Sequence, residues 1–423
     1  MKVAVVGTGI SGLVVAHRLA AEHDLTVFEA GDHIGGHTHT HDFTIDGRDF
    51  AVDSGFIVFN EKTYPNFCAL LRELGVEWRD SDMSFAVRDD RDGLEYNGTN
   101  LAGLFAQRRN LFRPRFWQMI RDILRFYRSA DGYLECPPER TLGQHLEEGK
   151  YSKTFIDQHI LPMGAAVWSS SPSDMERFPL QTFVRFFHNH GFLQVGGRPQ
   201  WLTVVGGSRG YIDPITANFR DRIRLETPVT SVRRVEGGVE IETAKGTCER
   251  FDRVVLACHS DQAVRMLGDA SALEKEILSA IPYQKNEVTI HTDVSVMPKA
   301  RRAWSSWNVR IDEGDSGVDP HLRATYWMNR LQGIDAPVDF FVTLNDGDAV
   351  HPDHVLRRLT YHHPLFTPEG IAAQERHGEI DGVNGVHFCG AYWGYGFHED
   401  GVRSALAVLE NFQGAASPAE AAA

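Results

Sequence analysis

The chain has 423 residues and a formal net charge of −14; 42% of its residues are hydrophobic and 24% are charged. This composition is typical of a soluble globular protein, and the acidic balance excludes a general nucleic-acid binder, which carries a basic excess. The length exceeds that of one simple core, so two domains, or one domain with an insertion, are expected. No uninterrupted apolar run reaches the ~18 residues of a membrane-spanning helix.

The five cysteines are scattered and form no C-x-x-C pair. This pattern favours neither a disulfide framework nor a cysteine zinc site, and it fits a reducing compartment. A cytoplasmic location is therefore expected. The cysteines are Cys68, Cys136, Cys248, Cys258 and Cys389.

Residues 3–28 predict a strand, a glycine-rich turn, a helix and a second strand. The turn, G-T-G-I-S-G, places Gly7 at a tight bend, Gly9 where backbone amides approach a pyrophosphate, and Gly12 where helix and strand pack closely. The free N–H groups at the helix start would face the phosphate charge. The second strand ends in Glu29, whose carboxylate can accept hydrogen bonds from both ribose hydroxyls. We therefore expect a dinucleotide without a 2′-phosphate.

The segment after Glu29, A-G-D-H-I-G-G-H-T, resembles the second signature of the flavin amine-oxidase superfamily, in which an acid and a short linker precede G-G-R. Gly35 and Gly36 match this signature, and His37 stands where the superfamily usually has arginine. The resemblance implies that this backbone wraps the pyrophosphate of FAD. An imidazole at this position could donate a hydrogen bond to phosphate, with less reach than a guanidinium.

Three histidines alternate with threonines in this segment. If it is extended, His37, His39 and His41 point to one side, and imidazole is a common zinc ligand. A metal site is thus the alternative to cofactor contact. It would need carboxylates such as Asp42 or Asp53, and no second ligand cluster is evident. We expect no metal.

Residues 385–412 predict a short strand at 386–389, a glycine-aromatic loop and a helix from about Asp400. The segment resembles the superfamily's C-terminal region, in which the first amides of the helix meet the N1–C2 carbonyl edge of the flavin. A helix N-terminus stabilises an anion such as the reduced flavin. Carboxylates there would oppose that charge unless they turn away, and a plain helix cap is the alternative role of Asp400. The resemblance places Glu399, Asp400, Gly401 and Val402 at this position.

Residues 225–258 alternate strands with Gly-Gly and Lys-Gly turns. Within them, T-P-V-T resembles the superfamily segment in which a valine, here Val229, touches the adenine side of FAD through its backbone. The predicted fold is α/β: a discontinuous Rossmann-like FAD-binding domain of the amine-oxidase or glutathione-reductase type with an inserted α+β substrate domain. The FAD-binding domain comprises residues 1–75, 205–285 and 380–412, the substrate domain residues 76–204 and 286–379, and a disordered tail is expected at 413–423.

No cysteine matches the superfamily's covalent flavin attachment site, so the resemblance implies non-covalent FAD. A separate NAD site is not evident, and oxygen or an electron carrier would reoxidise the flavin. The contacts assigned to FAD are Gly7, Gly9, Ser11, Gly12, Glu29, Ala30, Gly36, His37, Thr38, Val229, Gly390, Glu399, Asp400, Gly401 and Val402.

Within the superfamily, the chain resembles most a bacterial branch found beside or fused to cyclopropane-fatty-acyl-phospholipid synthases. This resemblance implies dehydrogenation or desaturation of an acyl chain in a cyclopropane or methyl-branched membrane phospholipid. Two alternatives stay open: an amine oxidase or non-redox flavin isomerase, and a flavin-carrying partner subunit of a lipid methyltransferase. The segments that carry the resemblance are G-G-H-T-H-T-H-D-F from Gly35 and residues 52–60, 107–117, 326–332 and 388–401.

Residues 101–128 hold seven arginines against one acid, Asp122, with six aromatic residues interleaved. On a helical projection from Phe116, apolar residues share one half and arginines cluster on the other. One interpretation is a segment that docks the protein on the inner face of an anionic membrane. The other is an amphipathic core helix with a solvated basic face. The arginines are Arg108, Arg109, Arg113, Arg115, Arg121, Arg125 and Arg128.

No motif fixes a catalytic residue. The superfamily's amine oxidases frame the flavin with two aromatic side chains and often a lysine-held water. Tyr395 and Phe397, together with Trp393, are candidates for the aromatic wall, and His398 for an acid or base. Packing of the loop, or an ordinary structural histidine, is the alternative for each.

Lys285 and Lys299 flank the segment where the amine-oxidase lysine would be sought, and neither lies in a convincing motif. Their placement weighs against ordinary amine oxidation. Trp168, in A-A-V-W-S-S-S-P, is a candidate for the wall of an acyl pocket or for an ordinary core position.

Overall fold

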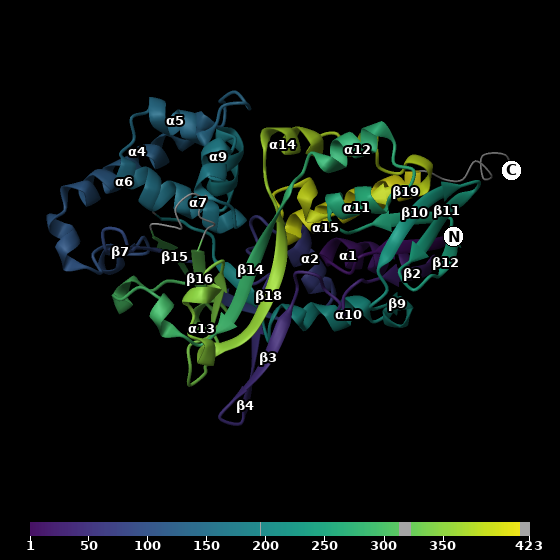
Figure 1. Cartoon of the computed structure of the whole chain (residues 1–423), viewed down its shortest axis with the longest axis horizontal. Coiled ribbons are helices and arrows are strands. Elements are labelled where there is room, and N and C mark those ends of the chain that lie inside the picture. Colours follow the sequence, from purple (N-terminus) through teal and green to yellow (C-terminus); the bar gives the residue numbers. More distant parts are fainter. Residues whose placement is uncertain (195, 313–322, 415–423) are drawn as a thin grey trace.

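The computed structural model describes residues 1–194, 196–312 and 323–414. Figure 1 shows two bodies side by side: a parallel-sheet body on the right, which carries the N-terminus, and a mixed-sheet body on the left with a layer of helices above it. The long strands β14 (Tyr283–His291) and β18 (Val355–Pro364) run between them.

A five-stranded parallel sheet carries the N-terminal motif, and this confirms the predicted α/β fold. Its order is β19-β13-β1-β2-β9, so β1 lies in the middle. The apolar residues of β1, Val3 to Val6, are buried, as expected of a parallel strand covered on both faces. The strands are β1 (Lys2–Val6), β2 (Asp24–Phe28), β9 (Ile223–Arg224), β13 (Arg253–Leu256) and β19 (Val386–Phe388).

Alternate side chains of β1 enter two separate cores. Val3 and Val5 pack with the helices of one face, and Ala4 and Val6 with those of the other and with a small antiparallel sheet, β10-β11-β12. The first face is covered by α1 (Ile10–Leu19), α2 (Pro65–Glu73), α10 (Ile212–Thr216) and α15 (His398–Gly414). The second is covered by α11 (Ser260–Met266), α12 (Ala272–Ser279), α14 (Pro368–Gln374), β10 (Val229–Val235), β11 (Gly238–Thr243) and β12 (Cys248–Phe251).

The other body is built on a seven-stranded sheet of order β18-β14-β17-β16-β15-β6-β7. Only β15 and β6 pair in parallel; the other neighbours pair antiparallel among the described residues. Its remaining strands are β6 (Phe85–Asp89), β7 (Leu94–Asn97), β15 (Trp307–Ile311), β16 (Arg323–Trp327) and β17 (Phe341–Leu344).

A layer of helices packs on this sheet and shares one phenylalanine-rich core with it. They are α3 (Leu101–Leu104), α4 (Pro114–Tyr133), α5 (Leu142–Glu148), α6 (Lys153–Phe155), α7 (Leu161–Trp168), α8 (Pro172–Arg177) and α9 (Leu180–Asn189). The remaining α-helices and strands of the described residues are the hairpin β3 (Thr40–Ile45) and β4 (Arg48–Asp53), the pair β5 (Trp78–Ser81) and β8 (Trp201–Val204), and α13 (Met328–Leu331).

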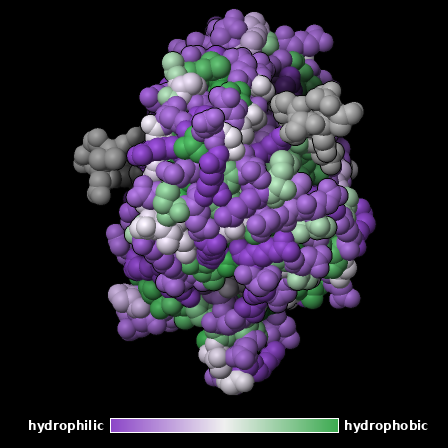
Figure 2. Space-filling view, turned by 90° about the vertical axis from the view of Figure 1, so that its right-hand side faces the viewer, coloured by the Kyte–Doolittle hydropathy of each residue, from purple (hydrophilic) through white to green (hydrophobic). Residues whose placement is uncertain are grey.

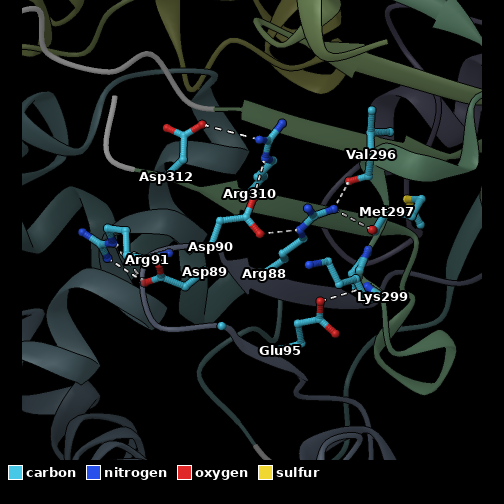
Figure 3. A network of polar contacts seen from close by, with 12 residues as sticks. Arg88, Asp89, Asp90, Arg91, Glu95, Val296, Met297, Lys299, Arg310 and Asp312 are labelled. Carbon is cyan, nitrogen blue, oxygen red and sulfur yellow. Dashed lines mark hydrogen bonds and ion pairs between the residues drawn. The ribbon is translucent and has the colours of Figure 1, made fainter. Parts of the chain in front are cut away.

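A polar network joins the end of the seven-stranded sheet to the loop at 294–303 (Figure 3). Arg88 donates to Asp90 over 2.8 Å and to the carbonyl of Met297 over 2.9 Å, and Arg310 donates to Asp90 over 2.9 Å. The carboxylate of Glu95 accepts from the backbone N–H of Lys299. Arg88, Asp90, Glu95 and Arg310 thus each meet an opposite charge or a backbone group. The network therefore stabilises the fold and offers no free charge to a ligand.

Two predicted boundaries shift in the structure. The strand expected at 386–389 ends at Phe388, and the helix expected from about Asp400 begins at His398. β14 runs without a break through the proposed domain boundary at 285–286, and the division into domains stays a prediction. Of the tail at 413–423, residues 413–414 end α15 and the rest lies outside the described residues.

Candidate functional site

A cavity of about 710 Å³ starts at the glycine-rich turn and continues between the two bodies. This volume is in the range of ligand and cofactor sites. One end is lined by the β1–α1 turn, the end of β2, residues 35–37 and the start of β10. The other end is lined by aromatic side chains of the helical layer, the mixed sheet and the loop after β19.

The glycines of the first turn have different physical roles. Gly7 has φ of 108°, and a Cβ there would lie 2.6 Å from the carbonyl oxygen of Ala257. A Cβ on Gly12 would lie 2.0 Å from the carbonyl oxygen of Gly7, so only glycine permits this approach of helix and strand. A Cβ on Gly9 would meet nothing within 4 Å, and no side chain caps the helix that follows. The first amides of α1 are therefore left for a ligand, as a pyrophosphate cradle requires.

Glu29 holds the turn in place from the end of β2. Its carboxylate accepts hydrogen bonds from the backbone N–H of Thr8 over 2.9 Å, from the Thr8 hydroxyl, and from the N–H of Gly31 over 2.8 Å. A carboxylate offers about four acceptor positions, so one remains for a ribose hydroxyl. The surroundings of Glu29 thus leave room for one ribose hydroxyl, where the sequence led us to expect both.

The G-G-H segment lies against the first turn. A Cβ on Gly36 would be 3.1 Å from the Cα of Gly9, so the two glycine segments touch through backbone. His37 borders the cavity, and its Nε2 is buried with no hydrogen-bond partner. Burial and the neighbouring His363 hold the pKa of His37 well below its ordinary value. A neutral imidazole with an unpartnered nitrogen fits an oxygen of FAD at this place.

The three alternating histidines do not form one row. His39 stacks on His33 at 3.8 Å and lies 4.0 Å from the ring of His41, whereas His37 lies 4.9 Å from Tyr361. Over residues 1–194, 196–312 and 323–414, no group of three or more His, Cys, Asp or Glu side chains is arranged to hold a metal ion.

The acids at the start of α15 turn away from the cavity. Glu399 accepts from the backbone N–H of Phe67 over 2.9 Å and from Asn66, at the start of α2. Asp400 accepts from the N–H of Phe397 over 3.1 Å, which makes it a cap of its own helix, and burial raises its pKa to about 6. Neither carboxylate therefore opposes negative charge in the cavity.

The predicted cofactor contacts fall into two groups, and their contact with FAD stays a prediction. Those that line the cavity are Gly7, Gly9, Ser11, Glu29, Ala30, Gly36, His37, Val229 and Gly390. Those that lie behind its wall are Gly12, Thr38, Glu399, Asp400, Gly401 and Val402.

His398 lines the cavity, but its ring is held by core neighbours. It stacks on Phe56 at 3.6 Å, and its Nε2 contacts the hydroxyls of Thr38 at 3.0 Å and Tyr211 at 3.2 Å. Burial lowers its pKa to about 3, so it is neutral at physiological pH. This geometry favours a structural role over the predicted acid or base.

Aromatic side chains form the far end of the cavity. Tyr395 and Phe397 line it as expected and pack against Phe186 at 5.4 and 5.1 Å. Trp393 is the exception among the proposed wall residues: it lies outside the lining and packs on His377 at 4.3 Å. The other wall residues are Trp168, Phe192, Trp201, Trp307, Tyr326 and Phe366.

The far end offers no charged partner for an amine. In the described part of the chain, Glu29 and Arg265 are the only lining residues among Asp, Glu, Lys and Arg, and Glu29 lies at the turn. Lys285 is 58% exposed and pairs with Glu287, and Lys299 is exposed as well. Neither lysine lines the cavity.

Two further histidines of the cavity were not found from the sequence. His363 accepts at Nδ1 from the side-chain amide of Asn286 over 2.9 Å, which leaves its proton on Nε2. His259 stacks on Tyr283 at 4.5 Å. Burial lowers the pKa of each histidine to about 4. For His363, the pair His362–His363 before Pro364 is the sequence feature that could have indicated a role in the site.

Comparisons with known proteins point to one family of flavoproteins. The family model described as flavin containing amine oxidoreductase matches residues 10–291. Over 44 residues, 10% of the chain, the sequence is 57% identical to tryptophan 2-monooxygenase from Agrobacterium vitis. The match covers only 6% of that protein's length.

Solved structures share the fold over nearly the whole chain. Cyclohexylamine oxidase from Brevibacterium oxydans IH-35A superposes with a TM-score of 0.66 at 19% identity, covering 97% of this chain and 99% of that one. Putrescine oxidase, solved with bound putrescine, gives 0.65 at 16% identity over 98% and 99%. The CLA-producing fatty acid isomerase from P. acnes gives 0.64 at 16% identity over 97% and 98%. At such identities the likeness concerns the fold.

Proposed function

We propose that this chain, which belongs to the family of flavin-containing amine oxidoreductases, dehydrogenates an acyl chain of a cyclopropane or methyl-branched membrane phospholipid. It is an FAD-dependent oxidoreductase. The observation that carries the proposed substrate is the aromatic end of the cavity, whose described lining offers apolar surface and neither a lysine nor a carboxylate.

Solvation favours an acyl chain over an amine at this end. Each methylene that leaves water contributes about 0.8 kcal/mol. An ammonium group would lose its hydration, and no described carboxylate of this end would replace it. The rings of Phe186, Tyr395 and Phe397 offer the continuous apolar contact that a chain of methylenes needs.

The residues of the chain position the reactants and exclude water. The first turn and Glu29 would hold the nucleotide, and the aromatic wall would hold the acyl chain beside the reactive ring. Dehydrogenation removes two electrons and two protons from adjacent carbons as a single bond becomes a double bond. FAD supplies the two-electron acceptor when bound, and oxygen or an electron carrier is the final oxidant.

The acyl proposal is tested by product analysis. Vesicles with cyclopropane or methyl-branched chains are incubated in air with the FAD-loaded protein, and the released fatty acids are examined by mass spectrometry. The proposal predicts a product lighter by two hydrogens that requires the protein. Unchanged acyl chains, with the flavin fully loaded, would overturn it.

Amine oxidation is the second candidate, because aromatic faces attract cations. The fold is shared with proteins named for cyclohexylamine and putrescine. This candidate predicts peroxide release when the protein is mixed with a panel of primary amines. The absence of a described lysine from the lining weighs against it.

A further inference from the structure

The helical layer exposes an unusual group of large apolar side chains near the start of α4. Phe112 is 86% exposed, Leu101 74%, Trp117 49% and Leu111 44%. Among the described residues, Phe112 is the only exposed phenylalanine and Trp117 the only exposed tryptophan. The other exposed large hydrophobic residues are methionine, leucine or valine. Together with Arg108, Arg115 and Arg121, these four form what we name the 101–121 surface.

Contacts tie Leu101, Leu111 and Trp117 to one ordered segment. Trp117 donates through Nε1 to the carbonyl oxygen of Leu111 over 2.9 Å. The ring of Phe105 lies 5.5 Å from that of Trp117, and the N–H of Phe105 bonds the carbonyl of Leu101 over 3.0 Å. The apolar residues are therefore presented to solvent by an ordered framework.

The charge of this surface is opposite to that of the whole chain. No Asp or Glu occurs between Tyr96 and Arg121, although the net charge of the chain is −14. Arg108, Arg115 and Arg121 are exposed, and none forms an ion pair with a residue that the structure describes. Their charge is available to an anionic partner.

The rest of α4 behaves as a core helix. Phe116, Met119 and Phe126 are buried in the helical layer. Arg125 pairs with the buried Asp122 and lies 3.7 Å from the ring of Tyr151. Both interpretations of residues 101–128 therefore apply: one face of α4 packs inside along its length, and the exposed residues of its first turns and of the segment before it are left for a partner.

We propose that the 101–121 surface docks the protein peripherally on an anionic phospholipid bilayer. Phe112 and Trp117 would enter the interface between headgroups and acyl chains, where aromatic rings are favoured. The arginines would meet the phosphate groups of the lipids. No helix in the described ranges is long and apolar enough to cross a membrane. By contrast, the face that carries the N-terminus and β10–β12 is mostly hydrophilic, with hydrophobic residues in small scattered groups (Figure 2). The proposal does not depend on the substrate.

Sedimentation with vesicles tests the proposal without turnover, so its failure is separate from that of the proposed function. The FAD-loaded protein is mixed with vesicles of phosphatidylglycerol and phosphatidylcholine, or of phosphatidylcholine alone, at low and high salt. We expect binding to the anionic vesicles at low salt and release at high salt, because salt screens the arginine contribution. No binding at low salt, or equal binding to both vesicles, would overturn the proposal.

Matched variants locate the docking surface. Phe112→Ser and the triple variant R108Q/R115Q/R121Q should each weaken vesicle binding at least about tenfold while flavin content and circular dichroism stay unchanged. The control triple R233Q/K275Q/R357Q removes the same charge from exposed positions elsewhere. Equal loss in the control would mean that the net charge and not this surface drives binding. Retained vesicle binding by both 101–121 variants would mean that another surface docks the protein, and it would overturn the proposal.

Discussion

The two ends of the cavity are built in different ways. The end at the first turn is made mostly of backbone from short local motifs, and in it the segments of Gly9 and Gly36 touch through backbone. The aromatic end is made of side chains from segments as distant as Trp168, Trp307 and Phe397. A site made of backbone is recorded in local spacing, whereas a site made of side chains depends on how the whole chain folds.

The largest effect should come from the backbone-built end. In Gly12→Ala, the new Cβ would lie 2.0 Å from the carbonyl oxygen of Gly7. We expect a loss of about 3 kcal/mol in the free energy of unfolding, together with loss of FAD. Denaturant unfolding and flavin absorbance measure both.

Gly132→Ala in α4 is the matched control, since a Cβ there meets nothing within 4 Å. It should not lower stability, because alanine favours helix more than glycine does. Equal loss in the two variants would contradict the close approach of α1 to β1.

The start of the chain could be predicted because glycine requirements are local. The spacing of Gly7, Gly9 and Gly12 is tied to one turn, and Glu29 follows at the end of the next strand. Phe186 and Trp307 could not be assigned from the sequence, because an apolar residue that lines a cavity has the same pattern as one in a core. The sequence predicted that α15 starts at about Asp400, two residues later than it does. A carboxylate that caps a helix is expected before its first turn, but Asp400 lies within that turn and accepts from the backbone N–H of Phe397.

Acid should destabilise the helical layer through its buried His159. Burial lowers the pKa of His159 to about 3 from its ordinary 6.5. The unfolded chain then binds a proton that the folded chain does not, so stability falls as pH drops from 6.5 toward 3. At pH 5 the contribution of one such histidine is about 2 kcal/mol.

His159→Gln should therefore reduce the stability difference between pH 7 and pH 5 by about 2 kcal/mol. Urea unfolding at the two pH values measures this difference. His351→Gln, at an exposed position, is the control and should leave the difference unchanged. An unchanged pH dependence in His159→Gln would mean that His159 is protonated in the folded protein.

A change at the aromatic end should affect the substrate and leave the cofactor in place. Tyr395→Ala removes a ring that packs on Phe186 at 5.4 Å. We expect kcat/KM for acyl substrates to fall about tenfold and FAD affinity to change less than about twofold. Tyr395→Phe, which keeps the ring, should retain activity. A large loss of FAD in Tyr395→Ala would remove the distinction between the ends.

His37 tests whether a side chain contributes at the backbone-built end. His37→Ala removes the buried, unpartnered Nε2 and should raise the dissociation constant of FAD about fivefold. His37→Arg, which restores a donor, should bind FAD at least as tightly as the unchanged chain. Titration of the apoprotein, followed by flavin fluorescence, measures both. An unchanged constant in His37→Ala would contradict cofactor contact by this side chain.

The smallest effect is expected at Lys285, which points to solvent and pairs with Glu287. Lys285→Ala should change the free energy of unfolding by less than about 0.5 kcal/mol, as surface substitutions commonly do. It should change kcat/KM by less than about twofold. Steady-state kinetics measure the activity. Loss of turnover in this variant would place a lysine in the reaction and favour amine oxidation.

The central claim is that FAD at the first turn faces an acyl chain at the aromatic end. It is tested most directly by mixing the oxidised, FAD-loaded protein with branched-chain phospholipid vesicles, and separately with amines, in the absence of oxygen. The account predicts that the yellow absorbance of the flavin bleaches with the lipid and persists with the amines. Bleaching by amines alone would contradict it.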